Sequence, residues 1–248
     1  KPVVLADAQD NPGAGGTSDT TGLLAAMVRN GATGAVIAVM YDPAVAAQAH
    51  AAGVGGVLDT ALGGKSGLEG IAPYHARFAV EALGDGRFTY TGAMNLNSKA
   101  QLGNMALLRV VDEGSEVRVV VGSSRSQCLD LAMIRHLGLE PTEQKIVAVK
   151  STVHFRADFD PIAAEILVVI APGIHPSAVI DPTAEIGAGA AIGPFAVIGA
   201  RVRIGAGARI GSHVSIGADA TIGTDALIHD GVRIGARVTI GDRPILHP

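Results

Sequence analysis

The sequence predicts two unlike parts: an α/β or α+β globular domain over residues 1–172, then a left-handed parallel β-helix of about four coils over residues 174–248. Two observations predict this division. In the first part, short apolar runs alternate with helix-forming segments, as they do in mixed domains. In the second part, an aliphatic residue recurs at every sixth position from Ile174 to Leu246. A period of six fits neither an α-helix nor an ordinary strand, but it fits a solenoid.

The composition limits the classes of function. The chain has 248 residues, a formal net charge of −4 and 3% aromatic residues, which disfavours nucleic-acid binding. Its one cysteine, Cys128, excludes an intrachain disulfide and indicates a reducing, cytoplasmic location. No apolar run reaches the roughly 18 residues of a membrane span. Because the chain starts at Lys1 without methionine, we interpret it as a fragment or a processed chain.

The elements of the first part follow from apolar runs, caps and turn residues. Apolar or alternating runs predict strands at 2–8, 34–40, 87–91, 106–112, 116–122, 146–149 and 166–170. Helix-forming residues predict helices at 20–29, 43–52 and 129–137, and a short helical turn at 161–165. Ser18 or Asp19 is the expected N-cap of the first helix, and Gly53 closes the second.

A glycine-rich loop joins the first predicted strand to the first helix. It contains Gly13 and Gly15, but Ser18 occupies the place of the third glycine in a dinucleotide fingerprint. Backbone N–H groups at such a helix start can hold an anion. The alternative is a tight connection with a capped helix.

A second segment with candidate chemistry follows the buried strand at 146–149. It contains Lys150, His154 and Arg156, which could clamp an anionic or carbonyl group. The alternative is a solvated loop with surface charges. The segment from Gly63 to Gly67 is similar to a phosphate loop only superficially, and a flexible turn is the favoured interpretation. No paired histidines occur, so no metal ligand set can be assigned in this chain.

The first part resembles the C-terminal domain of the MlrC, or microcystinase C, family of metallopeptidases. The resemblance rests on the blocks Lys1–Asp7, Asp10–Gly13, Asp19–Thr21, Gly63–Lys65 and Lys150–Arg156. It implies a two-domain zinc hydrolase that cleaves peptide bonds of small or cyclic peptides. The metal ligands would lie mainly in an N-terminal domain that is missing here.

The resemblance also implies which residues face the missing metal-binding domain. The 10–13 loop and the 150–156 segment would shape the substrate cleft, so no hydrolysis is expected from this part alone. The expected substrate-binding residues are Asp10, Asn11, Gly13, Lys150, Ser151, His154 and Arg156.

In the second part, each six-residue unit has two inward apolar positions. These are the recurring isoleucine and the small residue or valine two positions before it, and the residue between them points outward. A glycine usually follows the isoleucine, and we expect unusual φ angles at these glycines, such as Gly205. Three such units make one triangular coil. Only His247 and Pro248 follow Leu246, so the solenoid is expected to be truncated.

This part resembles the start of the hexapeptide-repeat acyltransferases of lipid A biosynthesis. The resemblance rests on 175–187 and 192–195, and 228–235 is closest to UDP-3-O-acylglucosamine N-acyltransferase (LpxD). It implies a homotrimer, an acyl carrier protein thioester as donor and a histidine general base that would follow the last residue. His213, His229 and His247 are interpreted as surface or intersubunit residues.

Three hypotheses follow. The chain is the C-terminal portion of a zinc metallopeptidase joined to a truncated solenoid and inactive alone. Alternatively, it is an LpxD-like acyltransferase with an unusual first domain. In the third hypothesis it is a non-catalytic module that the β-helix assembles into trimers.

Overall fold

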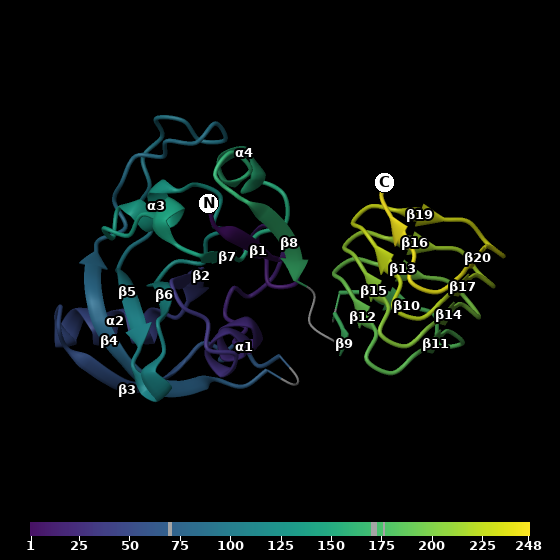
Figure 1. The fold of residues 1–248 in the computed structure, drawn as a ribbon, viewed down its shortest axis with the longest axis horizontal. Helices are drawn as coiled ribbons and strands as arrows, with labels where there is room; N and C mark the ends of the chain where they lie inside the picture. The colour runs from purple at the N-terminus through teal and green to yellow at the C-terminus, as the bar shows by residue number, and fades with distance from the viewer. Residues whose placement is uncertain (69–70, 170–172, 176) are drawn as a thin grey trace. The chain divides into compact units, whose positions relative to one another are not determined.

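The structure is a computed structural model that describes residues 1–68, 71–169, 173–175 and 177–248. The chain forms two compact units, unit 1 (Lys1–Val168) and unit 2 (Val169–Pro248). Unit 1 is an α/β body and unit 2 is a parallel β-helix (Figure 1), which confirms the predicted fold class. The predicted junction at 170–172, including the last residue of the predicted strand at 166–170, lies outside the described residues.

Unit 1 is organised around an eight-stranded mixed sheet in the order β3-β4-β5-β6-β2-β7-β1-β8. The strands β6, β2, β7 and β1 are parallel neighbours, whereas β3 to β6 form an antiparallel meander. The bounds are β1 (Val3–Asp7), β2 (Ala35–Tyr41), β3 (Val57–Leu62), β4 (Tyr74–Gly84), β5 (Met105–Val110), β6 (Val117–Gly122), β7 (Ile146–Val149) and β8 (Glu165–Val169).

Helices cover both faces of this sheet. On one face, Leu24 of α1 belongs to the same core as Ile37 of β2, and on the other face Phe159 of α4 belongs to the core that contains Val36. Because both faces are covered, the central strand β2 is apolar along nearly its whole length. The helices are α1 (Gly22–Arg29), α2 (Pro43–Ala52), α3 (Ala132–Arg135) and α4 (Arg156–Phe159), with 3-10 turns η1 (Pro12–Ala14), η2 (Asp112–Gly114) and η3 (Pro141–Glu143). Within the described part of the chain, no helix has the length and apolar character needed to cross a bilayer.

Most predicted elements of unit 1 are confirmed, and α2 and β7 have the predicted bounds. The predicted strand at 87–91 is wrong, because in this segment only an isolated β-bridge forms, between Thr89 and Lys99. The antiparallel partner of β5 is β4, which the sequence did not predict, and β3 was also missed. The alternating segment at 87–91 follows Gly86, whereas the strand that pairs with β5 ends before it, at Gly84.

Three further predictions are wrong in detail. The helix at 129–137 is reduced to α3, because Asp130 accepts the N–H of Ala132 and so starts the helix later. The helical turn at 161–165 lies earlier, as α4. Neither Ser18 nor Asp19 caps α1, whose N-cap position is Thr21 without a side-chain hydrogen bond.

Unit 2 consists of short parallel strands, each of which pairs with the strand three units further along. Ile192 lies opposite Ile210, which in turn lies opposite Ile228. The strands make three sheets, β10-β13-β16-β19, β11-β14-β17-β20 and β9-β12-β15-β18-β21. Their bounds are β9 (Gly173–Ile174), β10 (Val179–Ile180), β11 (Glu185–Ile186), β12 (Ala191–Ile192), β13 (Val197–Ile198), β14 (Arg203–Ile204), β15 (Arg209–Ile210), β16 (Ser215–Ile216), β17 (Thr221–Ile222), β18 (Leu227–Ile228), β19 (Arg233–Ile234), β20 (Thr239–Ile240) and β21 (Ile245–Leu246).

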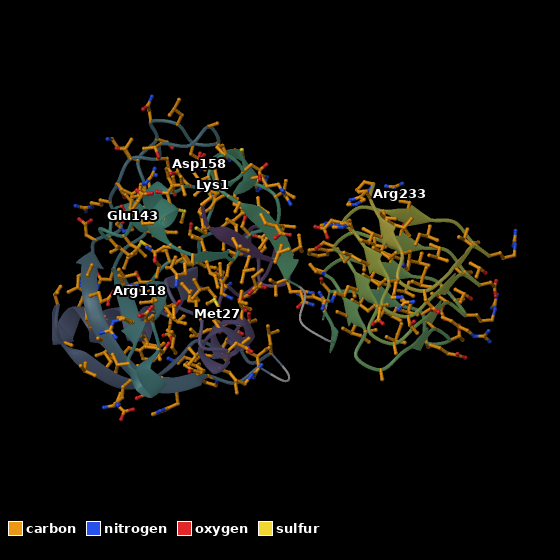
Figure 2. All side chains as sticks on the ribbon, in the orientation of Figure 1. Lys1, Met27, Arg118, Glu143, Asp158 and Arg233 are labelled. Carbon is orange, nitrogen blue, oxygen red and sulfur yellow. The ribbon has the colours of Figure 1, made fainter. Side chains whose placement is uncertain are left out.

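The isoleucines from Ile192 to Ile234 are buried inside the coils, as the period of six predicts. Figure 2 shows aliphatic side chains inside unit 2, with the labelled Arg233 pointing outward. Only the ends depart from this pattern: the Ile174 side chain is 53% exposed. The stacked aliphatic residues therefore form one continuous core along the solenoid.

The predicted unusual φ at the glycines after each isoleucine is wrong. Positive φ falls two residues later, at positions such as His213 (57°) and Asp219 (62°). The glycine is required for space: a Cβ added to Gly205 would lie 2.5 Å from the carbonyl carbon of Gly223 in the next coil. The recurring glycines thus allow the backbones of successive coils to approach closely.

Candidate functional site

The carboxyl ends of four neighbouring strands meet at one edge of the sheet in unit 1. These strands are β1, β7, β2 and β6, and all are parallel. The loops that follow them contain Asp10, Lys150, Asp42 and Arg125. Ligands of open α/β sheets bind outside the carboxyl ends of the strands, so this edge is the candidate site.

Asp10 organises the loop after β1. Its side chain is 1% exposed and accepts hydrogen bonds from the N–H groups of Ser18 (2.6 Å) and Thr20 (2.8 Å). The hydroxyl groups of Thr17 (3.0 Å) and Thr20 (2.9 Å) donate to the same carboxylate. These bonds wrap the glycine-rich loop around one buried anion, and Ser18 adopts φ of 60° to allow it. The loop therefore surrounds an internal carboxylate, and its Ser18 and Thr20 amides are not available to an external anion.

Lys150 neutralises this carboxylate from the end of β7. The ammonium, which is fully buried, donates to Asp10 Oδ2 (2.6 Å) and Asp7 Oδ2 (3.1 Å), and to the carbonyl of Thr20 (3.0 Å). Burial disfavours the charged form, but attraction to Asp7 and Asp10 outweighs it and raises the pKa of Lys150. Lys150 is thus an internal counter-ion, and it does not reach toward solvent as an anion clamp would.

Side-chain amides and hydroxyls link the loops after β1, β6 and β7. Asn11 Nδ2 donates to Thr152 Oγ1 (2.6 Å), and Gln127 Nε2 donates to Ser151 Oγ (2.8 Å). The other end of the Gln127 amide, Oε1, lies 3.2 Å from His154 Nδ1. His154 itself is exposed. This chain of bonds holds the His154 imidazole at the rim of the edge through its Nδ1 atom.

Two glycines make the loop after β1 fit against its neighbours. A Cβ on Gly13 would lie 2.6 Å from Gln127 Oε1, and one on Gly16 would lie 2.7 Å from the backbone N of Asn11. Both distances are shorter than side-chain packing allows. Gly13 and Gly16 are needed for close approach, whereas Gly15 is the glycine of this loop with a left-handed φ, of 91°.

The structure brings together most of the predicted site residues. Asp10 and Lys150 are in direct contact, and Asn11, Ser151 and His154 belong to the adjoining network. Gly13 lies against Gln127 of the same network. Arg156 is separate: it starts α4, where its guanidinium lies 5.6 Å from the Phe155 ring centroid and 3.4 Å from Asp160.

A second group of polar residues at this edge was missed. The loop after β3 is pinned by Asp19 and Asp42: Asp42 Oδ2 accepts from Gly63 N (2.9 Å) and Lys65 Nζ (2.7 Å). Asp19 accepts from the N–H groups of Lys65 and Ser66, both at 2.9 Å. The segment predicted as a flexible turn at 63–67 is thus held by hydrogen bonds at Gly63, Lys65 and Ser66. In the sequence, the adjacent pair Gly63 and Gly64 indicates only a turn, and both residues have positive φ in the structure.

His213, His229 and His247 of unit 2 each lie against an aromatic ring of an adjacent coil. His229 and His247 are parallel, with ring centroids 4.3 Å apart, and His213 lies 5.1 Å from the ring of Phe195. Each pair joins residues one coil apart. This arrangement supports a packing role for these rings.

The candidate site does not fit a catalytic metal ion. Among the described residues there is no group of three or more His, Cys, Asp or Glu side chains that could hold one. Two buried carboxylates of this edge, Asp7 and Asp10, already share the ammonium of Lys150. A divalent cation there would have to displace a buried positive charge. No step that involves a metal can therefore be derived from the described residues.

Comparisons with known proteins match two families to successive parts of the chain, and the first match extends to residue 182, into the repeats that begin at Ile174. The family described as MlrC C-terminus matches residues 5–182, and the bacterial transferase hexapeptide (six repeats) matches residues 183–218 and 207–243. Microcystinase C from Sphingomonas sp is 31% identical over 169 residues, which are 68% of this chain and 32% of that protein.

One solved structure supports the same relationship. The crystal structure of a candidate metallopeptidase from Mesorhizobium sp. BNC1 is 25% identical, with a TM-score of 0.61, over 70% of this chain and 34% of that one. The chain thus spans about a third of the length of each of these relatives.

Proposed function

Because the chain belongs to the MlrC C-terminus family through residues 5–182, we propose that unit 1 is the substrate-binding part of a metallopeptidase that hydrolyses peptide bonds. The metal would be held by another part of the enzyme, in the same or a different polypeptide. The observation that supports this division is the network of hydrogen bonds and ion pairs at the sheet edge, from the Asp10–Lys150 pair to Gln127 and His154. Its buried charges are fully engaged in holding loops, while His154 is presented outward. Zinc is the metal that we expect in the assembled enzyme.

In this proposal the loops after β1, β6 and β7 form one wall of the cleft. The Asp10–Lys150 pair keeps the wall rigid, and Gln127 fixes the orientation of the His154 ring. A fixed imidazole can donate to a peptide carbonyl or accept from a peptide N–H. Positioning of the substrate by such groups lowers the entropy cost of reaching the metal.

A graft tests this role. Residues 5–168 would replace the matching third of microcystinase C, and hydrolysis of a linear peptide would be measured with and without the graft. We expect the grafted enzyme to hydrolyse the peptide and the remaining two thirds alone to be inactive. In the graft, His154→Ala should lower kcat/KM by about tenfold, the worth of one hydrogen bond to substrate.

The matched control is His75→Ala, because His75 is also exposed but lies on β4 in the antiparallel meander. It should leave kcat/KM unchanged. Activity of the remaining two thirds without the graft, or equal effects of the two histidine variants, would contradict the proposal.

We also propose that unit 2 assembles three copies of the chain. The outer face of the sheet β10-β13-β16-β19 has two valines in register, Val179 (63% exposed) and Val197 (48% exposed). Exposed apolar residues side by side favour contact with another copy. The alternative function for this unit, acyl transfer, would be supported by transfer from acyl carrier protein to the amine of a UDP-sugar.

Light scattering after size-exclusion chromatography tests the assembly. We expect a particle of three times the 25.0 kDa chain mass. Val197→Glu should give single chains, because it places a charge in the apolar contact. Thr239→Glu, on the outward face of β20, is the control and should leave the particle unchanged. A wild-type particle of one chain mass would rule out the assembly.

A further inference from the structure

A cavity of about 270 Å³ lies beside the carboxyl end of β2 in unit 1. Resting on the proposed function, we propose that this cavity binds a carboxylate of the peptide, at its C-terminus or on an acidic side chain, through Arg125 and Lys65. The cavity is lined by Asp19, Tyr41, Asp42, Pro43, Ala44, Lys65, Ser66 and Arg125.

Arg125 is the main cation of this cavity. Its guanidinium carbon lies 4.9 Å from the centroid of the Tyr41 ring, and the side chain is exposed. In the part of the chain that the structure describes, Arg125 makes no ion pair. A guanidinium that stacks on an aromatic ring keeps its N–H groups in the plane for a carboxylate, to which it can bind through two parallel bonds. The Tyr41 ring thus prepares Arg125 for a planar anion.

Lys65 supplies a second cation on the same wall. Its ammonium donates to Asp42 Oδ2 at 2.7 Å, and its side chain remains 42% exposed. An ammonium has three N–H donors, and this contact uses one of them. Lys65 is therefore held in place by Asp42 and still has N–H groups for a ligand.

The two acidic residues of the wall do not block an anion. Asp42 uses one oxygen for the N–H of Val45 and the other for Gly63 and Lys65. Asp19 is bonded to Ser66 and to the N–H of Lys65. Each of the four carboxylate oxygens accepts at least one internal hydrogen bond, and Lys65 and Arg125 still have unused N–H donors for an anion.

The remaining lining limits the type of anion. The Tyr41 ring, Pro43 and Ala44 form an apolar wall next to the two cations. A cavity of this size lies just below the range for small-molecule ligands, so it suits one short group. A carboxylate on an aliphatic stem matches both the cations and the apolar wall, whereas inorganic phosphate matches only the cations.

Binding of simple peptides to the full chain tests the inference. The probes are acetyl-trialanine with a free C-terminal carboxylate, the same peptide as its C-terminal amide, and inorganic phosphate, with dissociation constants measured by calorimetry. We expect the free acid to bind at least about tenfold more tightly than the amide and more tightly than phosphate. Arg125→Gln should weaken binding of the free acid by about tenfold and leave the affinity for the amide unchanged.

The matched control is Arg29→Gln, which removes an exposed arginine at the end of α1 and should not change binding. The inference would be overturned by equal affinities for the acid and the amide, or by tighter binding of phosphate than of the acid. It would also be overturned if the Arg125→Gln variant bound the acid as tightly as the wild type does. The proposed function has a separate readout. If the graft hydrolyses the peptide and Arg125→Gln leaves its KM unchanged, the carboxylate-binding role of this cavity is rejected and the proposed function stands. If the graft is inactive but still binds the free acid, the proposed function is rejected.

Discussion

Lys150→Met is expected to destabilise unit 1 by about 3–5 kcal/mol at neutral pH. The substitution keeps a long side chain but removes the only positive charge that contacts the buried Asp10 carboxylate among the described residues. Removal of one partner of a buried ion pair leaves the other uncompensated, which has this magnitude. For a unit of this size, the loss corresponds to a fall in Tm of about 6–20 °C.

The effect should depend on pH in a defined direction. Burial disfavours the Asp10 carboxylate, but Lys150 and Thr20 outweigh burial and lower the pKa of Asp10. A lowered carboxyl pKa adds stability above the unfolded value of about 3.9, and this is lost as pH falls through the folded value. The raised pKa of Lys150 adds stability below about 10.4, which is lost as pH rises through its folded value. The difference between wild type and variant is therefore largest between these limits.

Without Lys150, only hydrogen bonds such as those from Thr20 oppose the effect of burial on Asp10, so the pKa of Asp10 should be higher in the variant than in the wild type. The stability gap should then narrow as pH is lowered and Asp10 is protonated in the variant. Thermal unfolding followed by tyrosine fluorescence measures this, because all three tyrosines, Tyr41, Tyr74 and Tyr90, belong to unit 1 and the chain has no tryptophan.

Lys145→Met is the control for the same chemical change. Lys145 is exposed, directly precedes β7 and donates to Thr33 at the surface. It should shift stability by less than about 0.5 kcal/mol. If the two methionine variants unfold at the same temperature, Lys150 is not the counter-ion that stabilises the loop after β1.

Ile210→Ala is expected to destabilise unit 2 by about 2–5 kcal/mol. The side chain is fully buried between Ile192 and Ile228 of the adjacent coils. Truncation removes buried apolar surface and leaves a cavity that the closely spaced backbones cannot fill. Chemical denaturation followed by far-ultraviolet circular dichroism should show an earlier transition, while tyrosine fluorescence should be unchanged.

Arg209→Ala is the control, because Arg209 precedes Ile210 on β15 and its side chain points outward. We expect a change of less than about 0.5 kcal/mol from this variant. A tyrosine transition that moves together with the circular dichroism transition in Ile210→Ala would show that the units do not unfold separately.

The β-helix could be predicted from the sequence because the pattern that specifies it is present in each six-residue unit. An isoleucine at each sixth position fixes which side chains are inside, and the pairing of every strand with the third one after it follows from the three-sided coil. The prediction failed only for the glycines, since their role depends on a backbone one coil away: Gly205 faces Gly223. Apolar runs likewise predicted the central strands of unit 1.

The candidate site depends on contacts that local patterns cannot show. Asp19 is a good N-cap by residue type, but its carboxylate is taken by amides at Lys65 and Ser66, 46 and 47 positions away. Lys150 reaches Asp10 across 140 positions, which turned a predicted anion clamp into an internal counter-ion. The cavity at Tyr41, Lys65 and Arg125 combines the end of β2 with two loops that are distant in the sequence, so it was not predicted from the sequence. The grouping of Asp10, Asn11 and Ser151 near the ends of neighbouring strands was predictable from their positions after apolar runs.

The pairing between successive coils also determines how the length of unit 2 can change. Because each strand lies on its equivalent one turn earlier, duplication or loss of one whole coil between Ile192 and Ile234 would preserve every neighbour. An insertion or deletion whose length is not a multiple of six residues would place the aliphatic side chains that follow it on the outer, solvent-exposed face. Each whole coil adds about 4.8 Å to the length of unit 2. The length of unit 2 can therefore change in fixed steps while the residues at the sheet edge of unit 1 stay the same.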